Sequence, residues 1–174
     1  MHHHDNYLAE FEPVTVYLGL GSNMGDRWQN LKSAINLLSR KVDMTVFSPV
    51  YDTAPIGNIE QPRFLNMACE AISMLTPVEL LAIVKQIELR IGRQPGPLNS
   101  PRLIDIDILF YGDQLINTAE LIIPHPRLAE RAFVLVPLSD IAPDFMHPIT
   151  GQSVSQMLNA LLRNSGDVVR WENV

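Results

Sequence analysis

Hydrophobic residues fall into two kinds of run along this 174-residue chain. Short apolar or alternating runs predict strands at residues 14–20, 44–51, 64–74 and 103–110. Runs with helical spacing predict helices at residues 26–38, 77–91 and 153–162, with shorter helical pieces between 126 and 141. Residues 115–123 predict a short hairpin, and segments rich in Pro, Gly and Asn separate the elements.

The order of these elements is β-α-β-β-α-β followed by C-terminal helices, which predicts the ferredoxin-like split arrangement. The expected class is therefore α+β, with an antiparallel-dominated sheet and helices on one face. Thr76 and Glu79 predict a capping box at the start of the second helix, and Gly92 ends this helix. We expect a flexible extension at residues 1–13 and a single domain at residues 14–174.

Two aspartates interrupt the apolar strand predicted at residues 103–110. Asp105 and Asp107 share one face of that strand, with Cα atoms roughly 7 Å apart at about 3.3 Å per residue. The opposite, apolar face is expected to carry Ile104, Ile106, Ile108 and Phe110. Two unpaired like charges on a half-buried strand are costly, and a divalent cation bound by both carboxylates would remove that cost.

Residues 19–25, Gly-Leu-Gly-Ser-Asn-Met-Gly, form a glycine-rich segment between the first strand and the first helix. A dinucleotide-binding fingerprint requires glycine at the sixth position, but that position is Met24, and Gly25 comes one residue too late. No lysine typical of a phosphate-binding loop follows. Two interpretations remain, namely a strand-to-helix turn that needs glycine geometry and a segment that contacts phosphate.

Arginines surround the polar loop at residues 94–101, which leads into the aspartate strand. Those that flank this loop or follow His125 are Arg90, Arg93, Arg102, Arg127 and Arg131. Each alone is typical of a solvated surface cation, but together with a metal on the aspartates they suit a polyphosphate. His125 lies between Pro124 and Pro126, in a rigid loop that suits a positioned hydrogen-bond donor or a plain surface turn. His147 has no such neighbours and is interpreted as structural.

The composition narrows the choice of partners. A net charge of -6 and a pI of about 5.3 argue against duplex nucleic acid, and 47% hydrophobic residues indicate a globular protein. No apolar run reaches the roughly 18 residues of a membrane span, and no signal-peptide pattern is present. Cys69 is the single cysteine, so we expect a cytoplasmic protein without an internal disulfide.

Seven short motifs follow one another in a specific order. They are YLGLGSN at residues 17–23, YDTAPIG at 51–57, QPRFLN at 61–66, IELRIGR at 87–93, PRLIDID at 101–107, PHPR at 124–127 and RAF at 131–133. Each motif is weak alone. In this order, over residues 15–162, the chain resembles the 6-hydroxymethyl-7,8-dihydropterin pyrophosphokinase family of the folate pathway.

The resemblance implies a Mg²⁺-dependent transferase that moves pyrophosphate from ATP to the pterin hydroxymethyl group and releases AMP. Asp105 and Asp107 match its catalytic ligands for two Mg²⁺ ions, while Arg93 and Arg102 match catalytic arginines that clamp the phosphates. The other positions that match ATP contacts are Glu88, Ile108, His125 and Arg131. The positions that match the pterin site are Thr53, Ala54, Ile56, Phe64, Asn66, Asp105 and Phe133. No residue is assigned as a general base.

Aromatic faces from Phe64 and Phe133 suit a flat heteroaromatic ring, and the amide of Asn66 suits its polar edge. We expect ATP and 6-hydroxymethyl-7,8-dihydropterin as partners, with no nucleic acid or membrane, in a monomer or weak dimer. The chain departs from the best-known family members at the loop of residues 94–101, which is one residue shorter and lacks their Trp and second Arg. Ser100 replaces their Gly, Ala54 a common Pro and Pro126 a common Tyr. A lid so rich in proline is expected to close through a smaller hinge motion.

Two other classes of protein compete with this interpretation. One is a non-catalytic ferredoxin-like regulator that binds a ligand and leaves the two aspartates solvated. The other is a metal-dependent nucleotide hydrolase that consumes ATP without any pterin. Formation of AMP from ATP that strictly requires the dihydropterin distinguishes the three.

Overall fold

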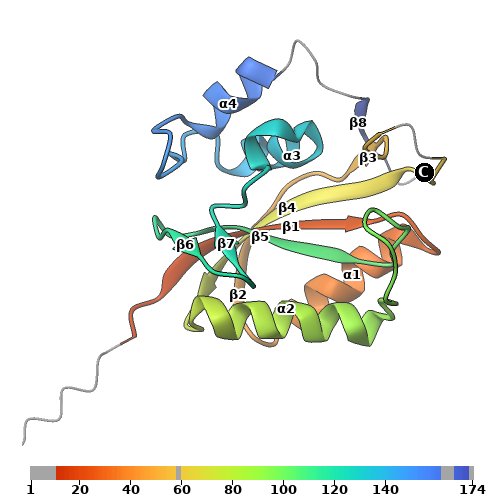
Figure 1. Cartoon of the computed structure of the whole chain (residues 1–174), viewed down its shortest axis with the longest axis horizontal. Coiled ribbons are helices and arrows are strands. Elements are labelled where there is room, and N and C mark those ends of the chain that lie inside the picture. The colour runs from red at the N-terminus through yellow and green to blue at the C-terminus, as the bar shows by residue number, and fades with distance from the viewer. Residues whose placement is uncertain (1–10, 58–59, 162–166, 173–174) are drawn as a thin grey trace, which may run out of the picture.

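The computed structural model describes residues 11–57, 60–161 and 167–172. Residues 1–10, most of the predicted extension, lie outside these ranges. Figure 1 shows one central sheet between two layers of helices. In chain order the elements are β1 (Val14–Ser22), α1 (Arg27–Leu38), β2 (Asp43–Phe47), β3 (Tyr51–Thr53), β4 (Phe64–Ser73), α2 (Pro77–Ile91), β5 (Asp105–Tyr111), β6 (Ile116–Asn117), β7 (Ile122–Ile123), the 3-10 helix η1 (Leu128–Glu130), α3 (Ala132–Ile141), α4 (Val154–Leu161) and β8 (Val168–Arg170).

The main sheet has the strand order β5-β1-β4-β3-β8, and β2 also pairs with β4. Each of these pairings is antiparallel. The central strand β1 pairs with β4 along its nine residues and with β5 on its other side. The order of β1, α1, β2–β3, β4, α2 and β5 is the predicted split arrangement, so the α+β class is confirmed. β6 and β7 form a separate small hairpin within the predicted range.

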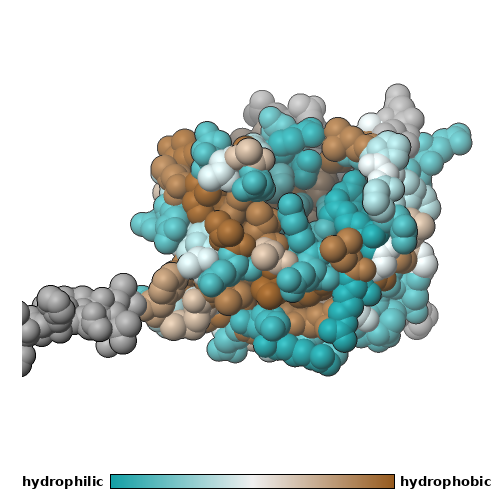
Figure 2. Space-filling view, turned by 60° about the horizontal axis from the view of Figure 1, so that its bottom comes forward, coloured by the Kyte–Doolittle hydropathy of each residue, from teal (hydrophilic) through white to brown (hydrophobic). Residues whose placement is uncertain are grey.

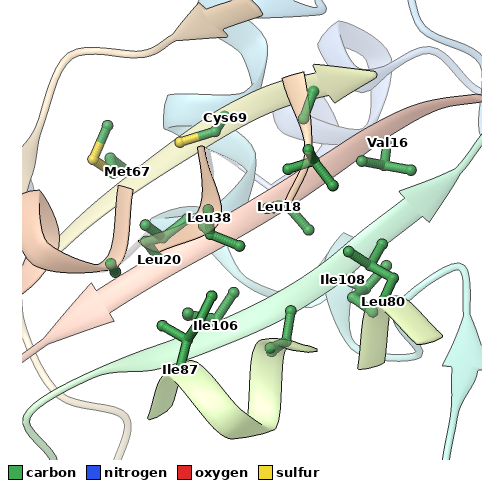
Figure 3. Close-up of a cluster of buried hydrophobic side chains, with 14 of the residues drawn as sticks. Val16, Leu18, Leu20, Leu38, Met67, Cys69, Leu80, Ile87, Ile106 and Ile108 are labelled. Carbon is green, nitrogen blue, oxygen red and sulfur yellow. The ribbon is translucent and has the colours of Figure 1, made fainter. Parts of the chain in front are cut away.

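Helices cover both faces of the sheet, which corrects the expectation that they lie on one face. In Figure 1, α1 and α2 lie on one side and α3 and α4 on the other. Figure 3 shows the core under α1 and α2, where Leu18 and Leu20 of β1 meet Leu38, Leu80 and Ile87 of the two helices. A second apolar cluster lies on the other face, under α3 and α4. The C-terminal helices therefore complete a three-layer structure.

The strand predicted at residues 44–51 is two strands, β2 and β3, which pair with opposite halves of β4. Ser48 lies between them and bonds Ala68 twice, because its N–H donates to the Ala68 carbonyl at 2.9 Å and its Oγ accepts from the Ala68 N–H at 2.8 Å. Pro49 follows and has no N–H with which to continue the ladder. The two strands are therefore separated at Ser48 and Pro49, where Ala68 of β4 holds Ser48.

β8 was not predicted, because a strand of three residues is too short to show a periodic pattern. It forms the outer edge of the sheet beside β3. Trp171, directly after β8, packs against Trp28 of α1 with ring centroids 5.6 Å apart. The C-terminal segment thus forms the last strand at one edge of the sheet, and Trp171 contacts the helix layer of α1 and α2.

The predicted apolar face of the aspartate strand is wrong at Phe110. Ile104, Ile106 and Ile108 belong to the core under α1 and α2, as expected. A register shift follows, because Leu18 pairs with Ile108 whereas Tyr17 pairs with Phe110. This β-bulge turns Phe110 to the other face, where its ring lies 6.4 Å from that of Tyr17.

The predicted caps of the second helix are confirmed in α2. The Thr76 N–H donates to Glu79 Oε2 at 2.7 Å, and the Glu79 N–H donates to Thr76 Oγ1 at 3.2 Å. Gly92 ends the helix with a φ of 118°, a left-handed conformation that glycine adopts without steric cost. Within the described part of the chain, no helix is long and apolar enough to cross a membrane.

Candidate active site

A cavity of about 370 Å³ lies where β1, β4 and β5 meet the segments that follow β3, α2 and β7. It brings together most of the residues that the sequence predicted for the site. Those that line it are Thr53, Ala54, Ile56, Phe64, Asn66, Glu88, Arg93, Arg102, Asp105, Asp107, His125, Arg131 and Phe133. Residues that are far apart in sequence thus share one partly open space of mixed polar and apolar character.

Asp105 and Asp107 face glycines on the neighbouring strand. The register pairs Asp105 with Gly21 and Asp107 with Gly19, so the adjacent positions of β1 carry no side chains. Gly19 lies in β1, within the strand predicted at residues 14–20, and Gly21 also lies in β1, which corrects its interpretation as part of the strand-to-helix turn. Gly25, with a φ of 64°, is the glycine that this turn uses.

Three arginines line the cavity around the carboxylates. Arg93 Nη1 lies 3.5 Å from Asp105 Oδ1, and Arg102 Nη1 lies 3.2 Å from Asp105 Oδ2. Arg131 lowers the pKa of Asp107 by its charge, although burial and the charge of Asp105 raise that pKa to about 7. Within the described residues, no Arg or Lys nitrogen lies within 4.0 Å of the Asp107 carboxylate, so its charge is the less compensated of the two.

His125 lies next to Asp107, with Nε2 3.9 Å from Asp107 Oδ1. Its Nδ1 accepts a hydrogen bond from the Arg127 N–H at 3.3 Å, so in the neutral ring the proton is on Nε2, the nitrogen nearer Asp107. Burial and the charge of Arg131 lower the pKa of His125 to about 4. The imidazole is therefore neutral near pH 7 and offers a donor without adding charge.

Glu88 links α2 to β5 and holds one arginine in place. Its carboxylate is buried; Oε1 accepts from the Ile106 N–H at 3.1 Å, and Oε2 pairs with Arg93. Burial raises the pKa of Glu88, and the Ile106 hydrogen bond and Arg93 oppose that rise. Both oxygens are thus engaged within the protein, and this geometry makes Glu88 a positioning residue for Arg93.

Asn23 had no predicted role of its own, yet it connects three segments around the cavity. Its Nδ2 donates to Gln61 Oε1 at 3.0 Å and to the Pro62 carbonyl at 3.2 Å. Its Oδ1 accepts from the Arg102 N–H at 2.8 Å, and its own N–H donates to the Arg102 carbonyl at 3.1 Å. Gln61 in turn bonds the Asn99 carbonyl. In the sequence, the only indication of this role is that Asn23 is a polar residue directly after the glycine-containing strand β1.

The opposite end of the cavity is aromatic and amide-lined. Phe64 comes from the start of β4 and Phe133 from the start of α3. Asn66 is buried, and its Nδ2 donates to Thr53 Oγ1 at 2.7 Å. The Arg131 guanidinium carbon lies 5.6 Å from the Phe133 ring centroid, which connects this end to the charged end.

Some predicted residues lie elsewhere. Ile108 is buried in the core beside Leu80, as Figure 3 shows, and its side chain does not line the cavity. Arg127 is exposed and lies 3.6 Å from Glu130, and Arg90 is exposed on α2. His147 is buried among apolar groups, in line with a structural role. Leu81 and Lys85 of α2 line the cavity and were not predicted.

The carboxylates fit a divalent cation by their chemistry. Asp105 and Asp107 offer oxygen ligands on one strand face, and the incompletely compensated charge of Asp107 favours a nearby positive ion. No group of three or more His, Cys, Asp or Glu side chains suited to a metal occurs in residues 11–57, 60–161 and 167–172. A donor set of two carboxylates is typical of Mg²⁺ that takes its other ligands from substrate phosphates and water.

Comparisons with known proteins agree on one family. Residues 17–143 match the family model described as 7,8-dihydro-6-hydroxymethylpterin-pyrophosphokinase. A 2-amino-4-hydroxy-6-hydroxymethyldihydropteridine pyrophosphokinase from Bacillus subtilis is 42% identical over 143 residues, which cover 81% of this chain and 86% of that protein. The corresponding protein from Aquifex aeolicus is 44% identical over 136 residues, or 78% and 85% of the two chains.

Longer relatives match over part of their length. A folic acid synthesis protein from Dictyostelium discoideum is 44% identical over 154 residues, 88% of this chain but 23% of that protein. The chain thus spans about a quarter of the length of such relatives. A crystal structure of Plasmodium falciparum HPPK-DHPS shares the fold, with a TM-score of 0.74 at 17% identity over 90% of this chain and 46% of that one. The chain belongs to the 7,8-dihydro-6-hydroxymethylpterin-pyrophosphokinase family.

Proposed function

We propose that this chain transfers pyrophosphate from ATP to 6-hydroxymethyl-7,8-dihydropterin in folate biosynthesis, giving the pterin diphosphate and AMP. The observation that carries the proposal is one cavity lined by a carboxylate pair, three arginines, two phenylalanines and the Asn66 amide. The bacterial relatives of similar length are named for this activity. A cytoplasmic location and a monomeric or weakly dimeric state remain predictions from the sequence.

The charged end suits the triphosphate. Arg93, Arg102 and Arg131 line the cavity, and their guanidinium groups donate several N–H bonds to phosphate oxygens in a fixed planar geometry. The Glu88 carboxylate holds Arg93, and the Asn23 contacts hold the backbone of Arg102. The two arginines are therefore held in place before ATP binds, which reduces the entropy lost on binding.

Asp105 and Asp107 would hold Mg²⁺, with two ions expected for the site. When bound, the metal neutralises phosphate charge and orients the phosphate groups for displacement. Without ATP, Arg93 and Arg102 balance part of the carboxylate charge. The neutral His125 places a donor beside Asp107 and adds no positive charge that would repel a cation.

The other end suits the pterin. Phe64 and Phe133 line the cavity and can stack on a flat heteroaromatic ring, and the buried Asn66 and Thr53 can supply polar groups to its edge. Ala54 and Ile56 complete this side of the cavity. This pocket adjoins the carboxylates, so a hydroxymethyl group on the ring can reach the phosphates.

The proposed reaction is an in-line displacement. The pterin hydroxymethyl oxygen forms a bond to the β-phosphorus of ATP, the bond from that phosphorus to the bridging oxygen of AMP breaks, and the hydroxyl proton leaves to solvent. We assign no general base. The chain contributes by holding two substrates in line within the cavity and by placing arginines against the developing charge.

The decisive experiment measures AMP formation by the purified protein with ATP and Mg²⁺, with and without 6-hydroxymethyl-7,8-dihydropterin. We expect AMP to form only with the pterin, in equal amount to the pterin diphosphate. ATP consumption without pterin would instead indicate a nucleotide hydrolase. Pterin binding without any ATP consumption would indicate a ligand-binding regulator, and either outcome contradicts the proposal.

A further inference from the structure

The pterin side of the cavity depends on a strand of three residues. β3 ends at Thr53, and Ala54 and Ile56, which line the cavity, follow it directly. One edge of β3 pairs with β4 and the other with β8, where Asp52 lies opposite Val169. A strand this short makes few hydrogen bonds of its own, so its neighbours determine where the following segment lies.

The ladder with β8 extends past β3 into the cavity-lining segment. The Ala54 N–H donates to the Asp167 carbonyl at 3.1 Å, and at the other end the Trp171 N–H donates to the Val50 carbonyl at 2.9 Å. In an antiparallel pair, alternate residues direct their backbone groups to the partner. Residues 167, 169 and 171 therefore face β3, whereas 168 and 170 direct their N–H groups away from it.

Side chains reinforce this backbone contact. Arg63, the residue before Phe64, donates from Nη1 to Asp167 Oδ2 at 2.7 Å and from Nη2 to the Asp52 carbonyl at 3.2 Å. Arg27 of α1 donates to Asp52 Oδ2 at 3.1 Å. Ion pairs as exposed as these contribute little one by one, so the backbone pairing carries the larger share.

The end of β8 is anchored independently. Trp171 packs against Trp28, and both rings lie against the core cluster under α1 and α2. Trp171 thus anchors the end of β8 to the core, and the backbone of β8 pairs with β3. The residue before β8 reaches the cavity lining through its bond to the Ala54 N–H, and β8 also lies against α3, whose residues Phe133 and Val134 line the cavity.

We propose that β8 with Asp167 positions the pterin, by fixing the segment from Thr53 to Ile56 through its pairing with β3. This inference rests on the proposed function. The strand acts through other residues and touches no reacting atom. Its loss should therefore weaken pterin binding and leave the phosphate chemistry intact.

The test compares two proline substitutions in neighbouring positions of β8. Val169→Pro removes an N–H that faces β3, and the Val169 side chain is 54% exposed, so little packing is lost. Val168→Pro is the matched control, because an N–H that faces away from the sheet tolerates proline at an edge strand. Steady-state kinetics with each substrate and hydrogen–deuterium exchange at the Ala54 amide are the measurements.

We expect Val169→Pro to raise the KM for pterin about tenfold, the effect of losing about one net hydrogen bond, with kcat and the KM for ATP within about twofold. The Ala54 amide should exchange faster in this variant. Val168→Pro should match the wild type in both readouts. An unchanged KM for pterin in a folded Val169→Pro protein, or equal effects of both prolines, would overturn the proposal.

If Val169→Pro does not fold, Asp167→Ala decides. It should raise the KM for pterin about twofold to threefold, in keeping with an exposed ion pair, and Asp167→Glu should restore it. No change with Asp167→Ala contradicts the proposal. Failure of the proposed function shows separately, as absence of pterin-dependent AMP formation in the wild type, and the exchange of the Ala54 amide still tests the structural link.

Discussion

Asp107 lies near Asp105 and Glu88 in a partly enclosed cavity. Burial and the negative charges of these two residues raise the pKa of Asp107. A carboxylate in this setting is costly to the folded chain alone, and a bound cation would remove that cost. We expect Asp107→Asn to lower turnover by more than about a hundredfold in Mg²⁺ buffer. Without metal, the variant should unfold at the same or a higher temperature, because one of three close negative charges is removed.

Asp113→Asn is the matched control for this substitution, since Asp113 is exposed in the turn after β5. Activity assays in Mg²⁺ and thermal unfolding in EDTA are the two measurements. Near-normal turnover in Asp107→Asn would remove Asp107 from the metal site.

Arg102 contacts Asp105, while its backbone is held by Asn23. Arg102→Ala removes the guanidinium and leaves these backbone contacts in place. We expect kcat to fall about a hundredfold, while the Kd for pterin changes less than about threefold, because the guanidinium acts on the phosphates. Arg90→Ala, an exposed arginine on α2, should change neither value. An unchanged kcat in Arg102→Ala would exclude it from catalysis.

All but one of the residues that the sequence predicted for the site line the cavity, because polar and aromatic side chains in ordered motifs can be recognised without the fold. Whether they act there remains a prediction. The sequence missed Asn23 and Arg63, whose partners are distant: Asn23 bonds Arg102, and Arg63 bonds Asp167. It placed Phe110 on the wrong face because a bulge cannot be seen in an alternating pattern. Contacts between distant segments, and single-residue shifts in register, need the folded backbone.

At the level of elements, the space beside each glycine of β1 shows which of them the site requires. A Cβ built on Gly21 would lie 2.5 Å from Asn66 Oδ1, whereas a Cβ on Gly19 would lie 3.5 Å from the nearest Leu109 side-chain atom. Gly21 thus leaves room for the Asn66 amide. An added methyl group at position 21 must displace this amide, and at position 19 it meets an ordinary contact.

We therefore expect Gly21→Ala to weaken pterin binding about tenfold, because Asn66 moves from its place beside Thr53. Gly19→Ala should bind pterin within about twofold of the wild type. Equilibrium titration of each variant with pterin makes the comparison. Equal affinities for Gly21→Ala and Gly19→Ala would show that the position of Asn66 is not important.

The helices and long strands could be predicted because periodicity extends over many residues, and the caps of α2 were visible as Thr76, Glu79 and Gly92. β8 could not be predicted, because three residues are too few to show a hydrophobic periodicity. The split between β2 and β3 depends on Ser48 bonding to Ala68 across the sheet. Elements set by local pattern were predictable, whereas elements set by a partner strand were not.

At the level of the whole molecule, stability should depend on pH through His147. Its Nδ1 accepts from the Ile149 N–H at 3.2 Å and the Thr150 N–H at 3.3 Å, and burial lowers its pKa. The unfolded chain therefore takes up the proton first. The stability due to the neutral ring is present above the unfolded pKa of about 6.5 and is lost as the pH falls through the folded pKa.

His147→Asn keeps an acceptor near the two N–H groups but cannot be protonated. We expect the free energy of unfolding to fall less between pH 7.5 and 5.0 in this variant than in the wild type. Urea unfolding at the two pH values measures the difference. The same slope in both proteins would show that His147 does not contribute.

The cavity is lined by residues from Gly19 to Val134, which belong to strands, helices and loops far apart in the sequence. A chain that has folded only in part cannot assemble it, because the lining residues come together only with the complete tertiary structure. Ligand binding and global folding are therefore thermodynamically linked, and a ligand at a hundred times its Kd adds about 2.7 kcal/mol to stability. Under the proposed function, the supply of nucleotide and pterin in a cell would then influence how much of this protein escapes proteolysis, as well as how fast it works.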